Sequence, residues 1–88
     1  MEDMQYAIAQ AQSVKSRYEE TLMRKANVVG VGIGLRRQGG EILNQPAIVV
    51  SVTDKKPLDS LMPDDVIPSE LDGVPVDVQA VGHLRAFS

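Results

Sequence analysis

The spacing of the apolar residues changes abruptly near residue 27, and this change limits the possible fold more than any other feature. Between about residues 2 and 26, apolar side chains recur every three or four positions, as on one face of an α-helix. No Pro or Gly interrupts this segment, and Asn27 follows it as a residue suited to end a helix. We therefore predict a long helix over residues 2–26, with its apolar stripe formed by Met4, Ile8, Ala11, Val14, Tyr18 and Leu22.

Beyond residue 27 the apolar residues alternate with a period of two, which is typical of β-strands. The clearest alternation covers residues 28–36, where aliphatic residues alternate with glycines. Gly39-Gly40 can form the tight turn of a hairpin to a second strand at residues 46–54. A third strand is predicted at residues 74–81, after an Asp72-Gly73 turn.

Three prolines interrupt the segment between the second and third predicted strands, so we expect a crossover with short helical turns near 58–62 and 69–71. The predicted fold class is α+β: one domain over residues 1–88, with the long helix packed on an open, mainly antiparallel three-stranded sheet. The expected core comprises Ile8, Val14, Leu22, Val31, Ile33, Val50 and Val76.

Composition excludes several kinds of functional site but does not identify a function. The chain has 88 residues, a net charge of −3 and no cysteine, which excludes disulfides, thiolate metal sites and a cysteine nucleophile. The acidic N-terminus does not resemble a signal peptide, and no apolar run is long enough for a membrane span. We expect a cytoplasmic protein that does not bind a membrane.

No catalytic constellation is evident. The glycines at 30, 32 and 34 fit neither a dinucleotide-binding fingerprint nor a phosphate-binding loop, because a turn and a strand follow them instead of a helix. A hydrolase would have to use His83, the sole histidine, with an acidic partner. The acidic residues Asp64, Asp65, Glu70 and Asp72 do not have calcium-loop spacing. We therefore predict no enzyme activity, no cofactor and no metal.

The net negative charge argues against nucleic acid as the main partner. A weaker alternative is a nucleotide or RNA binder that uses Arg36, Arg37 and the glycine strand.

The three alternating glycines themselves suggest an interaction surface. Glycine weakens a strand interior, and in strands it often marks a sharp bend or the close approach of another backbone. Bending and close packing of the helix remain the alternative explanations. If the helix covers the aliphatic face of the sheet, the opposite face carries the candidate surface Gly30, Gly32, Gly34, Ala47, Val49 and Ser51.

Three blocks in order carry a family resemblance. They are Asn27-Val-Val-Gly-Val-Gly-Ile-Gly, Gln45-Pro-Ala-Ile-Val-Val-Ser-Val and Ile67-Pro-Ser-Glu-Leu-Asp-Gly-Val-Pro-Val-Asp-Val. Over residues 27–82 the chain resembles the N-terminal module that precedes bacterial trypsin-like serine protease domains, a group related to the plant narrow-leaf protease. In that group the catalytic residues lie downstream of this segment, so none is carried over to this chain.

The resemblance implies a non-enzymatic accessory module, either an excised N-terminal domain or a free-standing relative. Its expected partner is a protein, either a covalently linked catalytic domain or a second copy in a homo-oligomer. The alternative to an accessory module is a fragment of a serine hydrolase, or a small hydrolase that uses His83 with an acidic partner.

Overall fold

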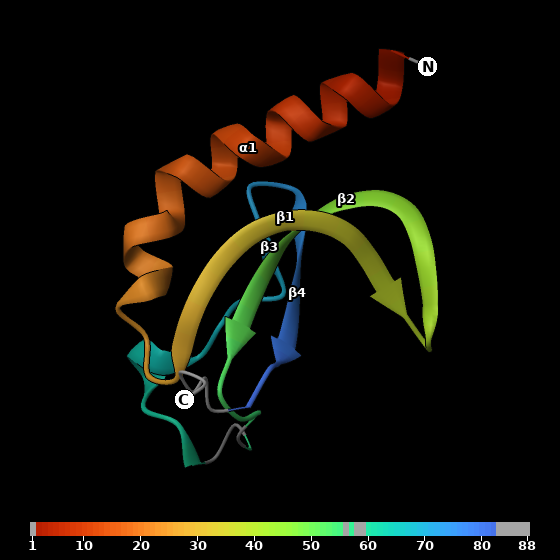
Figure 1. Cartoon of the computed structure of the whole chain (residues 1–88). Helices are drawn as coiled ribbons and strands as arrows, with labels where there is room; N and C mark the ends of the chain where they lie inside the picture. The colour runs from red at the N-terminus through yellow and green to blue at the C-terminus, as the bar shows by residue number, and fades with distance from the viewer. Residues whose placement is uncertain (1, 56, 58–59, 83–88) are drawn as a thin grey trace, which may run out of the picture.

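A long helix packs across one face of a β-sheet in the computed structural model, which describes residues 2–55, 57 and 60–82 (Figure 1). The helix is α1 (Glu2–Met23), and a 3-10 turn, η2 (Pro63–Asp65), lies between the second and third strands. The α+β class agrees with the prediction from the sequence. The strands are β1 (Val28–Gln38), β2 (Glu41–Val52), β3 (Glu70–Leu71) and β4 (Val74–Ala80).

The sheet differs from the predicted one, which was three-stranded and mainly antiparallel. It has four strands in the order β1-β2-β4-β3, and β4 runs parallel to β2, from the pair Ile48–Val76 to the pair Val52–Ala80. Parallel neighbours need a long crossover, and residues 53–73 supply it. The segment 69–71, expected to be a helical turn, instead contains β3, which pairs antiparallel with β4.

The hairpin of β1 and β2 turns at Gly39-Gly40, as predicted. Both glycines have positive φ, 59° and 85°, and the pair Gln38–Glu41 closes a two-residue loop. β2 begins at Glu41, earlier than the predicted residue 46, so Pro46 lies inside the strand. Proline is tolerated there because β4 pairs with β2 only from Ile48 onward. The end of the hairpin curls away from α1 (Figure 1).

The core lies between α1 and the sheet. The predicted core residues Val14, Leu22 and Val50 are buried, and three others, Val31, Ile33 and Val76, pack against them. Ile8 was wrongly assigned to the core, since it is 37% exposed. A 22-residue helix is about 33 Å long, and the N-terminal end of α1 rises away from the sheet (Figure 1). The remaining buried members of the cluster are Ala11, Ile48, Val52 and Val74.

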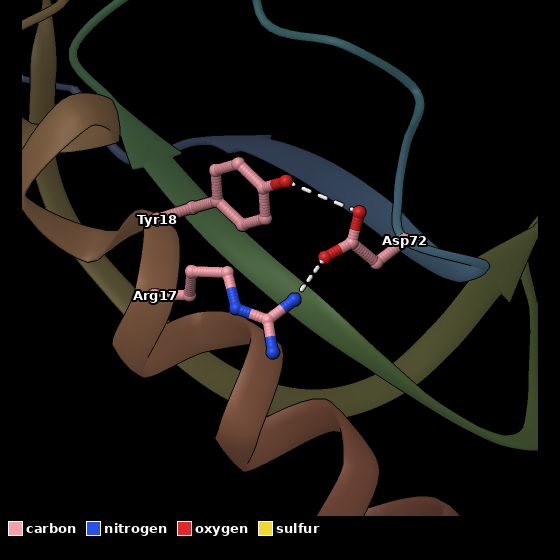
Figure 2. A network of polar contacts seen from close by, with 3 residues as sticks. All are labelled: Arg17, Tyr18 and Asp72. Carbon is pink, nitrogen blue, oxygen red and sulfur yellow. Dashed lines mark hydrogen bonds and ion pairs between the residues drawn. The ribbon is translucent and has the colours of Figure 1, made fainter.

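Polar contacts join the C-terminal half of α1, and the residues just after it, to the segment between β2 and β4. Figure 2 shows Asp72, in the turn between β3 and β4, forming an ion pair with Arg17 and accepting a hydrogen bond of 3.1 Å from the Tyr18 hydroxyl. Beyond the helix end, the Ala26 amide donates to Asp65 Oδ1 at 2.9 Å. Asn27, with φ of 71°, accepts a hydrogen bond of 2.9 Å from the Thr53 amide through its carbonyl oxygen. These contacts keep α1 on one face of the sheet.

The outer side of α1 carries charge. Two ion pairs join residues four positions apart, Lys15 with Glu19 and Arg24 with Glu20, each at 3.0 Å. In the part of the chain that the structure describes, no helix has both the length and the hydrophobicity needed to cross a bilayer.

Candidate interaction surface

Strand register determines which residues share each face of the sheet. Val31 pairs with Val50 and Ile33 with Ile48, and these residues belong to the core under α1. Successive side chains of a strand point to opposite faces, so the neighbouring residues face away from the helix. On that face Gly30 pairs with Ser51, Gly32 with Val49 and Gly34 with Ala47, while β4 contributes Asp77 and Gln79. The glycine face therefore lies opposite the helix.

The glycine face is hollowed into an open cleft of about 560 Å³. The curl of the hairpin places Ile42, which is 61% exposed, at the same cleft as the glycines. Gln79 of β4 also lines the cleft. The lining is mainly apolar, and at three positions of β1 it consists of backbone without side chains. The complete lining is Gly30, Val31, Gly32, Ile33, Gly34, Leu35, Ile42, Val49, Ser51 and Gln79.

Only one of the three glycines is required by packing within the chain. A Cβ atom on Gly34 would lie 2.9 Å from Val49 Cγ2, which is too close for two carbon atoms. A Cβ on Gly30 would make an ordinary contact of 3.8 Å with Ser51, and one on Gly32 would meet nothing within 4 Å. Close packing within the hairpin therefore explains Gly34 but gives no reason for Gly30 or Gly32.

Five of the six candidate surface residues come together at the cleft, and Ala47 does not. Ala47 is completely buried and does not line the cleft, so its side chain offers no contact to a partner. Sequence reasoning missed the other five lining residues, which are Val31, Ile33, Leu35, Ile42 and Gln79. Ile42 carried no signal, because residues 41–45 lack the alternation of a strand and precede the strand predicted at residues 46–54.

The described residues form no site for the two alternative functions, a hydrolase and a nucleotide or RNA binder. Arg36 is half-buried, and its Nη1 donates to Gln45 Oε1 at 3.2 Å. The Arg37 side chain and all of His83 lie outside the described residues. β1 runs through all three glycines to Gln38, so they do not form a loop ahead of a helix.

The acidic crossover residues make contacts within the chain. Asp65 accepts from the Ala26 amide, and Asp72 binds Arg17 and Tyr18. The Asp64 carbonyl accepts a hydrogen bond of 2.6 Å from Lys25 Nζ. These acidic residues hold the crossover against the end of α1.

Fold and cleft define a small α+β module with a helix on one face of its sheet and an open cleft on the other. The model of the family described as the NARROW LEAF 1 N-terminal domain matches residues 13–81, which include all four strands and the whole cleft. The chain belongs to this family. Membership of an N-terminal domain family indicates an accessory module, and it confirms the narrow-leaf relationship predicted from the sequence. A comparison with curated proteins found none that matches.

Proposed function

We propose that this chain is a non-enzymatic accessory module that docks on a trypsin-like catalytic domain through its glycine face. The observation that carries the proposal is the cleft on this face. Packing within the chain does not require glycine at positions 30 and 32, and the missing side chains leave open space in the cleft. Glycine at such positions lets the backbone or side chains of a partner approach a strand closely. Membership of an N-terminal domain family supports the accessory role.

The chemistry of the cleft supports binding over catalysis. Its lining residues include one hydroxyl, that of Ser51, and no histidine, carboxylate or lysine that could activate it. The Asp77 carboxylate on the same face accepts a hydrogen bond of 3.4 Å from the Gln79 amide. We expect no hydrolysis of p-nitrophenyl acetate above the buffer rate. Turnover that disappears in His83→Ala would contradict the non-enzymatic role.

The absence of cysteine provides a direct test of docking, because a single introduced thiol can be labelled uniquely. Ser51→Cys, in the cleft, and Ser13→Cys, on the exposed side of α1, would each carry a benzophenone photo-crosslinker. Each would be mixed with a separately expressed bacterial trypsin-like domain of the kind that follows such modules.

We expect a cross-link to the catalytic domain from position 51 and none from position 13. Cross-linking from position 13 alone would place the contact on the helix and contradict the proposed surface. If two copies of this chain cross-linked and sedimentation velocity showed a dimer, the glycine face would mediate self-association, and docking on a catalytic domain would be contradicted.

A further inference from the structure

The two edges of the sheet differ in length and in composition. β3 forms one edge with only two residues, and one of them is the charged Glu70. β1 forms the other edge with 11 residues, which extend about 36 Å at the usual rise of a strand. Proteins commonly protect edges by keeping them short or by placing charge and proline there. β3 has this protection, and most of β1 does not.

The central part of the β1 edge is regular and uncharged. Register shifts occur between Val28 and Gly30 and between Leu35 and Arg37, and the six residues between them pair with β2 without interruption. These residues, Gly30–Leu35, contain neither proline nor a charged side chain. In an antiparallel pair every second residue directs its N–H and C=O groups away from its partner.

No other described segment forms backbone hydrogen bonds with those outward groups. β1 pairs with β2 alone, and no backbone hydrogen bond from another described segment reaches residues 29–38. Figure 1 shows β1 arching along the margin of the sheet. A row of unpaired backbone donors and acceptors is complementary to another extended backbone.

We propose that the β1 edge binds an extended strand of the partner, whose large apolar side chains at alternate positions lie over Gly30 and Gly32. The inference rests on the proposed docking function and names its mode. Aromatic side chains on a neighbouring strand can cover glycines and replace the missing packing. Val29 and Leu35, near the two ends of this edge, are 38% and 43% exposed and offer further apolar contacts to the bound strand.

The glycines also favour a foreign strand over a second copy of this chain. A two-fold antiparallel pairing of β1 with its equivalent would continue the sheet with both glycine faces on the same side. Residues directly opposite each other would then share a face, so glycines would oppose glycines and the space above them would stay empty. The occupant is therefore a strand with large residues at every second position.

The probe is a fluorescent peptide, Glu-Thr-Phe-Thr-Phe-Thr-Phe-Glu, and its binding would be followed by fluorescence anisotropy. Two further versions would carry N-methyl groups on all the phenylalanine amides or on the three threonine amides. A strand adds through one of its edges, so we expect one N-methylated version to bind and the other to fail. Equal binding of both would overturn strand addition, because nonspecific apolar contact does not depend on one row of amides.

A protein variant tests the glycine contact. Gly32→Thr should still fold, because a Cβ there meets nothing within 4 Å, and circular dichroism would verify this. We expect it to weaken peptide binding about tenfold, equivalent to about 1.4 kcal/mol, by occupying the space for phenylalanine. Asn44→Thr, at an exposed β2 position outside the cleft lining, is the matched control and should bind normally. Normal binding by folded Gly32→Thr would contradict the proposed glycine contact.

The two proposals can fail separately. If the unmodified peptide does not bind while the cross-link from position 51 to the catalytic domain forms, strand addition is wrong and docking stands. If the peptide binds and shifts the amide resonances of residues 29–36 but the cross-link is absent, strand addition stands and the proposed partner domain is wrong.

Discussion

The two faces of the sheet use the same strands in opposite ways. On the helix side, Ile48 and Val50 are fully buried and form the core with Leu22 of α1. On the other side, the neighbouring residues Val49 and Ser51 line an open cleft beside Gly30 and Gly32. The chain therefore concentrates its stabilising aliphatic contacts on one face and leaves β1 bare on the other.

This difference separates residues needed for folding from residues available for binding. Side chains under α1 remove apolar surface from water, which is the main favourable contribution to folding. Gly32 has no side chain, and a Cβ atom added there would meet no other atom within 4 Å. Changes on the helix side should therefore reduce stability, whereas changes at Gly32 should affect binding.

Leu22→Ala should cause the largest loss. Leu22 is 1% exposed, and replacement of a buried leucine by alanine costs about 2–5 kcal/mol, from lost burial and the cavity left behind. Urea denaturation would measure the change, with Met23→Ala, at a neighbouring exposed position, as the control. If Leu22→Ala left the unfolding midpoint unchanged, the helix-side core would be misassigned.

Gly34→Ala should cost about 1–3 kcal/mol, because its added Cβ would lie 2.9 Å from Val49 Cγ2. The double variant Gly34→Ala/Val49→Ala removes that methyl group, so the alanine should cost little in that background. Denaturation of the four proteins in the cycle would measure the coupling. Additive effects would show that the close approach of these two residues does not limit position 34.

Gly32→Thr should stabilise the domain by about 0.5–1 kcal/mol, because threonine restricts the unfolded backbone and suits a strand. A change in the free energy of unfolding opposite in sign to that of Gly34→Ala would show that the glycines are not equivalent. Thermal denaturation would detect an increased midpoint. A decrease would mean that the glycine face is enclosed, contrary to the open cleft.

Asp72→Asn should have the smallest effect, about 0.5 kcal/mol or less, because the ion pair with Arg17 is exposed to solvent. Asparagine accepts the positive φ of 50° at this position, so the substitution tests charge without straining the turn. The difference from the parent protein should shrink further in 1 M NaCl. Tyr18→Phe would measure the accompanying hydrogen bond separately.

The sequence specified the local elements well because each rests on short-range physics. The apolar stripe from Met4 to Leu22 has helical spacing. In residues 28–36 the aliphatic residues alternate with a period of two, and only a strand places such residues on a single face. Gly39-Gly40 suits a two-residue turn. The same period of two also put Gly30, Gly32 and Gly34 on one face, which is where the structure has them.

The long-range features could not be read in the same way. The crossover over residues 53–73 is long enough for either direction of β4, and β3 is too short to produce a pattern. Ile8 has the right spacing for the core, but spacing does not reveal how far a sheet extends beneath a helix. The burial of Ala47 and the position of Ile42 at the cleft depend on how distant parts of the chain pack, which local spacing does not reveal.

The position of Pro46 has a consequence for how the hairpin exchanges its amide hydrogens. β4 pairs with β2 only over Ile48–Val52, and Pro46 lacks an amide hydrogen near a register shift in β1. The outer hairpin, residues 36–45, therefore has few neighbours besides itself and can open while the inner part stays folded. Its amides should exchange with deuterium by local opening at a low free energy. Those of Ile48, Val50 and Val52 should exchange only when the whole domain unfolds.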